Sequence, residues 1–205
     1  MEVDLITENT RATNKYLTMS DKDIANQVLK FINENVIVDR FPVSKEIMPD
    51  GKHSDCHVVI NVSDDFYLMH SDKVLQSGKQ NYYFPMGEDE GGMGLNSIYG
   101  ALHVLYQVYT EKPEWKVLLH CQAGKNRSPT IKSAFYYMML GEHEPDKTKE
   151  GGRNNRLIDN CERGNLPPLN KIEPFLQKCK EAFDNMDKFY GGMFDWIINE
   201  SKINE

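Results

Sequence analysis

The stretch that most constrains the fold is VLLHCQAGKNRSPT, which runs from Val117 to Thr130. It begins with an apolar run that predicts a buried strand, and a short polar loop follows. Gly124 allows that loop to bend, and Pro129 fits the first turn of a helix, where its missing N–H costs nothing. Apolar residues then recur at helical spacing and predict a buried helix: Ile131, Ala134, Phe135 and Met138. The stretch therefore predicts a strand, a tight loop and a helix.

Strands and helices alternate along the rest of the chain. Residues 56–62 (CHVVINV), 80–86 (QNYYFPM) and 116–120 (KVLLH) predict strands. One helix is predicted to start at a capping box of Ser20 and Asp23, and a second to run from Leu95 to the Lys112-Pro113 pair. A helix that restarts after residues 167–168 is expected to break at Gly191-Gly192, with a last short helix beyond the break.

This order predicts one α/β domain over residues 1–205, with residues 1–19 as a loosely held arm. The expected architecture is a central, mostly parallel sheet of about four to five strands with helices on both faces. The polar loop after residue 120 would then lie at the carboxyl end of a strand, where open α/β sheets place their ligand sites.

Composition and charge exclude several classes of function. With 40% apolar and 27% charged residues the chain has the composition of a soluble globular protein. The net charge of -7, without a basic stripe, disfavours nucleic acid as a partner. No segment is apolar enough to predict a membrane span or a secretory leader. The four cysteines lack zinc-ligand spacing, so we expect reduced thiols, a cytoplasmic location and neither a metal nor another cofactor.

The loop between strand and helix has the chemistry of an anion site. Consecutive backbone N–H groups in such a loop can turn inward, and the helix N-terminus adds partial positive charge. Cys121 stands at the mouth of the loop, where these groups favour the reactive thiolate. The planar guanidinium of Arg127 could take two phosphoryl oxygens at once and stabilise the charge that builds up during phosphoryl transfer.

HCQAGKNRS resembles the H-C-x5-R-S/T signature of the cysteine-based protein tyrosine phosphatase superfamily, most closely its dual-specificity branch. The resemblance implies hydrolysis through a cysteinyl-phosphate, with Cys121 as nucleophile and Arg127 as phosphate clamp. It further implies that Ser128 bonds the departing thiolate and that His120 orients the loop and helps to keep the thiol ionised. The residues implied to bind phosphate with Arg127 are Gln122, Ala123, Gly124, Lys125 and Asn126.

The family also uses an aspartic acid, one helix earlier, to protonate the leaving group. The acidic loop GEDEGGMG offers Glu88, Asp89 and Glu90, and the separation of Asp89 from Cys121 favours Asp89. Glu88 remains open, because the loop does not determine the register. Asp64 and Asp65 are poorer candidates, and we expect them to cap a turn or to line the substrate rim.

The predicted function is hydrolysis of phosphotyrosine in proteins or peptides, and of phosphoserine and phosphothreonine if the pocket is shallow. Lys125 keeps a phosphoinositide or inositol-phosphate phosphatase as an alternative, and an inactive phosphate-binding module is a second. A rhodanese-type sulfurtransferase fits the motif less well. Cys56 is interpreted as a buried strand residue rather than a redox partner of Cys121. The oligomeric state is left open.

Overall fold

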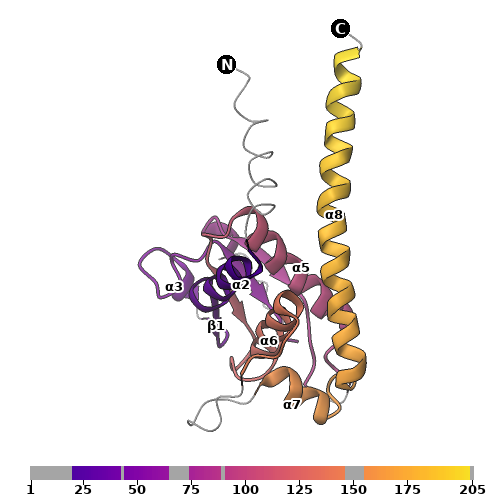
Figure 1. Ribbon diagram of the computed structural model, residues 1–205. Helices are drawn as coiled ribbons and strands as arrows, with labels where there is room; N and C mark the ends of the chain where they lie inside the picture. Colours follow the sequence, from indigo (N-terminus) through magenta and orange to yellow (C-terminus); the bar gives the residue numbers. More distant parts are fainter. Residues whose placement is uncertain (1–19, 43, 65–73, 89–90, 146–154, 204–205) are drawn as a thin grey trace.

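A four-stranded parallel sheet forms the centre of the computed structural model, which describes residues 20–42, 44–64, 74–88, 91–145 and 155–203 (Figure 1). The strands lie in the order β1 (Val36–Asp39), β4 (Val117–His120), β2 (Val58–Asn61) and β3 (Gln80–Tyr83). Asp39 and Asn61 both pair with His120, so the three strands end at one level. The predicted fold class, a parallel α/β sheet flanked by helices, is confirmed.

Strand β1 is the sheet element that the sequence analysis missed. Its VIVD segment directly follows the helix α2 (Asp21–Lys30) and the π-helix η1 (Phe31–Asn35), with no turn residue between them. The local sequence does not mark where this strand begins, and its pairing with β4 stabilises it instead. Asn35 Nδ2, just before the strand, donates to the Trp115 carbonyl at 3.1 Å. The start of α2 is confirmed, because the Ser20 side chain accepts the Asp23 N–H.

The two faces of the sheet are covered unequally. One face packs against α2, α5 (Leu95–Glu111), α6 (Arg127–Leu140), α7 (Arg156–Glu162) and α8 (Leu169–Ile203), which share the larger core with Val58 and Ile60. Val59, on the opposite side of the pleat, belongs to a smaller core beside α3 (Ser44–Ile47). Helices on both faces were expected, but among the described elements the long ones share one face.

Helix α8 continues through Gly191 and Gly192, so the predicted break at this pair is wrong. Glycine lowers helix propensity by only about 1 kcal/mol relative to alanine, which weakens a helix without ending it. In Figure 1 the C-terminal part of α8 extends beyond the rest of the fold. None of the helices in the described part of the chain has the length and apolarity that a bilayer crossing requires.

Candidate active site

The carboxyl ends of all four strands meet at one edge of the sheet. Strand β4 delivers His120 and then Cys121, and β2 ends at Asn61, three residues before Asp64. The chain after β1 lies against the loop that follows β4, because the Phe41 N–H donates to the Gln122 carbonyl at 3.0 Å. Groups that are distant in sequence are therefore assembled here by the parallel topology.

The loop after β4 surrounds the sulfur of Cys121 with donors. Ser128 Oγ lies 3.2 Å from Sγ as a hydrogen-bond donor, and the backbone N–H groups of Gly124, Asn126 and Ser128 also bond the sulfur. Burial alone would raise the pKa of the Cys121 thiol, but these hydrogen bonds outweigh it and lower the pKa below its ordinary value of 9.0. Helix α6, whose first residue is Arg127, adds its N-terminal partial charge.

Gly124 is required by the close approach of the loop to β1. Its φ is +66°, and a Cβ at this position would lie 2.5 Å from Arg40 N and 2.5 Å from the Asp39 carbonyl carbon. Both neighbours are backbone atoms, so no side chain could rotate away. The sequence analysis predicted the bend, but the contact with β1 could not be predicted without the strand.

The other predicted residues of the loop divide by exposure. His120 is fully buried, and its ring packs edge-on against Phe41 with 4.9 Å between the ring centroids. The buried imidazole therefore lies between β4 and the chain after β1. By contrast, the side chains that face solvent are those of Gln122, Ala123 and Lys125. These positions leave backbone amides, rather than side chains, on the inner surface of the loop.

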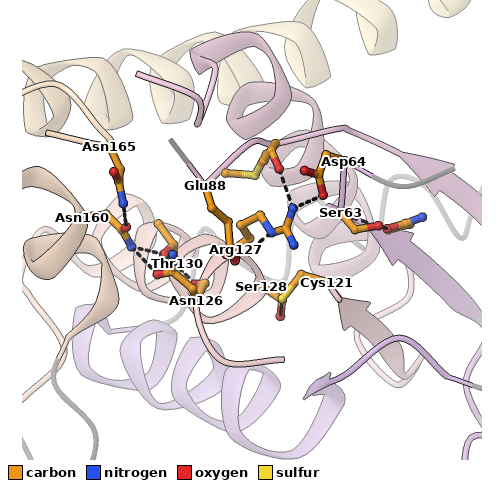
Figure 2. A network of polar contacts seen from close by, with 12 residues as sticks. Ser63, Asp64, Glu88, Cys121, Asn126, Arg127, Ser128, Thr130, Asn160 and Asn165 are labelled. Atoms are coloured by element: carbon orange, nitrogen blue, oxygen red, sulfur yellow. Dashed lines mark hydrogen bonds and ion pairs between the residues drawn. The ribbon is translucent and has the colours of Figure 1, made fainter. Parts of the chain in front are cut away.

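Arg127 is almost fully buried, with 1% of the residue exposed. Its Nη1 donates to Asp64 Oδ1 and, at 2.9 Å, to the Met86 carbonyl, and its Nε lies 3.2 Å from Glu88 Oε1 (Figure 2). Burial would lower the pKa of Arg127, but the hydrogen bond to Asp64 and the negative charge of Glu88 raise it. The guanidinium is thus a fixed cation beside Cys121.

An asparagine network connects the loop and the first turn of α6 to helix α7. Asn160, a fully buried residue of α7, donates to Asn126 Oδ1 and to Thr130 Oγ1, each at 2.8 Å (Figure 2). Asn165 Nδ2 in turn donates to Asn160 Oδ1 at 2.8 Å. The sequence analysis did not identify this network. The available signal was a polar residue on the core-facing side of a short helix, three positions after the buried Leu157.

The acidic candidates have different outcomes. Asp89 and Glu90 lie outside the described residues, so the predicted general acid stays a prediction. Glu88 lies at the site through its contact with Arg127 Nε, and 53% of its side chain is exposed. Asp64, expected only to cap a turn or line the substrate rim, contacts Arg127, the predicted phosphate clamp.

Cys56 is too distant to form a disulfide with Cys121. It lies two residues before β2, at the amino ends of the strands, whereas Cys121 follows the carboxyl end of β4. At about 3.3 Å per residue the separation is roughly 20 Å, well beyond the reach of a disulfide. The Cys56 thiol is 2% exposed, and burial raises its pKa to about 11. Its interpretation as a buried structural residue holds.

No protein-family model matches the sequence, and no curated protein matches it. Similar solved structures include Tk-PTP in its active form, with 20% identity over 74% of this chain and 95% of that chain and a TM-score of 0.48. PTPMT1 in complex with PI(5)P has 14% identity over 76% and 96%, with a TM-score of 0.48. The core catalytic domain of the PP-IP phosphatase SIW14 from S. cerevisiae has 14% identity over 78% and 88%, with a TM-score of 0.41.

At these identities the comparisons concern the fold alone, so the evidence for a function comes from the motif and from the geometry that it adopts. The H-C-x5-R-S motif forms a loop whose amides bond the Cys121 sulfur beside a buried Arg127. This geometry is what the resemblance of the motif to the cysteine-based protein tyrosine phosphatase superfamily predicts.

Proposed function

We propose that this protein is a phosphoric monoester hydrolase that acts through a cysteinyl-phosphate, with residues 1–205 as one phosphatase domain. The observation that carries the proposal is the environment of Cys121, whose sulfur is bonded by Ser128 Oγ and three backbone N–H groups. Arg127 supports it, because its buried Nε has no aligned hydrogen-bond acceptor among the described residues. A phosphoryl oxygen could take the place of the half-exposed Glu88 carboxylate, which lies 3.2 Å from Nε. Thiolate and cation are what phosphoryl transfer to sulfur requires.

In the first step the Cys121 thiolate attacks phosphorus. The Sγ–P bond forms as the bond from phosphorus to the ester oxygen breaks, and a general acid protonates the departing oxygen. We assign this acid to Asp89, in the loop between β3 and α5. The backbone amides of residues 122–126 and the guanidinium of Arg127 stabilise the charge on the equatorial oxygens.

In the second step water attacks the cysteinyl-phosphate. The new P–O bond forms as the Sγ–P bond breaks, and the carboxylate left by the first step takes the proton from the water. Ser128 Oγ, at 3.2 Å from Sγ, stabilises the thiolate as it departs. His120 holds the start of the loop through its packing on Phe41 and in this way preserves the position of the nucleophile. No step calls for a metal or another cofactor.

The proposed substrates are phosphotyrosine residues of proteins or peptides, together with phosphoserine and phosphothreonine, in the reducing environment of the cytoplasm. The exposed side chain of Lys125 in the loop favours a second candidate, a phosphoinositide or inositol phosphate with another phosphate to contact. Values of kcat/KM on phosphopeptides and on inositol phosphates separate the two. Higher values on the inositol phosphates would transfer the assignment to the second candidate.

Covalent trapping tests the proposed reaction. Wild-type protein quenched during turnover of an aryl phosphate should carry one phosphoryl group on Cys121, located by peptide mass spectrometry. Cys121→Ser should carry none and should release no phosphate, whereas Cys179→Ser, at a buried cysteine of α8, should behave as wild type. Tight binding of a phosphopeptide by the wild type without any release of phosphate would instead identify an inactive binding module.

The general acid has its own test. Asp89→Asn should slow turnover of an alkyl phosphate by about 10²-fold to 10⁴-fold and that of an activated aryl phosphate much less, because only a poor leaving group needs the proton. Glu88→Gln should spare this difference between the two substrates. If Glu88→Gln shows the large, leaving-group-dependent loss and Asp89→Asn shows none, the acid is Glu88.

A further inference from the structure

Both hydrogen bonds of the Arg127 guanidinium to described residues are made by Nη1. Its Nη1 has two protons, and their acceptors are Asp64 Oδ1 and the Met86 carbonyl oxygen, the latter at 2.9 Å. Among the described residues the buried Nε has no aligned acceptor, although the Glu88 carboxylate lies 3.2 Å away. The two hydrogen bonds of Nη1 therefore determine the direction in which the Nε edge of the guanidinium points.

Asp64 is held in place by the strand ends that carry it. Asn61 Oδ1 accepts both the N–H of Ser63, at 2.9 Å, and its hydroxyl, at 2.7 Å, and Ser63 is fully buried. Tyr83, the last residue of β3, donates its hydroxyl to the Asp64 carbonyl oxygen at 3.1 Å. The Asp64 backbone is thus fixed by β2 and β3, although 57% of its side chain is exposed.

The geometry matters because a guanidinium binds a phosphoryl group with two parallel N–H groups. If the Nη1 contacts were lost, the side chain could rotate, which would keep the charge of Arg127 but misdirect the fork. Orientation contributes most in the transition state, where charge spreads over the equatorial oxygens. A neutral carbonyl at Met86 holds one proton of Nη1, and only Asp64 adds a charged acceptor at that nitrogen.

We propose that Asp64 is a positioning residue for phosphoryl transfer, which pins Arg127 Nη1 so that the Nε edge of the guanidinium faces the Cys121 loop. The proposal rests on the proposed function and adds a residue that the family signature does not contain. It makes the orientation of Arg127 depend on the segment after β2 as well as on the loop that carries the arginine.

Asp64→Ala and Asp64→Asn test the proposal, because the second keeps an acceptor oxygen and the first removes it. Loss of the orienting contact should lower kcat on an aryl phosphate by about 10²-fold in Asp64→Ala, whereas KM should change by less than about threefold. Asp64→Asn should recover most of the lost kcat. Asp55→Ala is the matched control, because Asp55 is also half-exposed and ion-paired, with Lys116 at the opposite end of the strands. It should retain wild-type kinetics.

Binding of vanadate, which can adopt the five-coordinate geometry of the transition state, provides a readout without turnover. Calorimetric titration of Asp64→Ala should show vanadate affinity lower by about 10²-fold and inorganic phosphate affinity lower by about threefold at most. Equal losses for the two anions, or wild-type affinity for vanadate, would overturn the proposal. The titration separates it from the proposed function, since a protein that hydrolyses nothing can still show the vanadate effect, and an active one can lack it.

Discussion

Gly124→Ala should disable the site without removing any of its functional groups. The residue has a φ of +66°, and an added methyl group would meet the backbone of Asp39 and Arg40 at 2.5 Å. Ordinary contacts of a Cβ begin at 3.4 Å, so the loop and the end of β1 must separate by about 1 Å. A displacement of that size in a catalytic group costs about 10²-fold in rate, which corresponds to about 2.7 kcal/mol of transition-state stabilisation.

The left-handed backbone adds a cost that falls on stability instead. For a residue with a Cβ it is about 1–2 kcal/mol. Gly141→Ala isolates this cost, because Gly141, the C-cap of α6, has a φ of +72° and would place its Cβ in open space. The control should therefore lose about 1–2 kcal/mol of unfolding free energy and keep its activity.

The assay pairs initial rates on an aryl phosphate with urea unfolding of the wild type and both variants. We expect kcat/KM to fall at least about 10²-fold in Gly124→Ala and to remain within about twofold of wild type in Gly141→Ala. Wild-type activity in Gly124→Ala would show that the loop tolerates displacement from β1, and the reasoning would be refuted. An equal loss in Gly141→Ala would refute it too, because the effect would then be one of backbone strain alone.

Four other outcomes are expected. Ser128→Ala should raise the pKa of Cys121 and slow hydrolysis of the cysteinyl-phosphate by about 10²-fold, so that the phosphorylated protein accumulates in quenched samples. At about pH 7, iodoacetamide should modify Cys121 first, and mass spectrometry should find slow modification of the cysteines whose pKa is raised to about 11: Cys56, Cys161 and Cys179. Because folding lowers the pKa of Cys121, its ionisation should add stability that is fully present above pH 9.0 and is lost as the pH falls through the lowered value, an effect absent from Cys121→Ser. Asn160→Ala should cost about 3 kcal/mol in urea unfolding and reduce turnover, since it leaves buried groups of the loop without their donor, whereas Asn165→Ala should cost less.

The strand, loop and helix around Cys121 could be predicted from sequence because their determinants are local. The apolar run before Cys121, the bend at Gly124 and the proline in the first turn of α6 lie within one short stretch, and each acts on its immediate neighbours. The same locality explains why the start of α2 at Ser20 was predicted correctly.

The remaining parts of the site depend on contacts between distant segments. Asp64 and Arg127 are 63 positions apart, and only the parallel alignment of β2 with β4 brings them together. Strand β1 is determined by its pairing with β4 rather than by turn residues around it. The glycine pair in α8 illustrates the opposite error, in which an unfavourable local propensity was interpreted as a boundary.

Because the carboxyl ends of four strands meet at one edge of the sheet, different chain segments form the centre and the border of the site. Cys121 and its donors belong to one connection, whereas the segments after β1, β2 and β3 border it from separate directions. In the proposed enzyme, insertions or substitutions in those three segments would alter which phosphorylated molecule fits without changing the groups that are proposed to break the ester bond. In such an architecture, substrate preference can therefore change through each bordering segment separately, without any change to the apolar core that packs on the sheet.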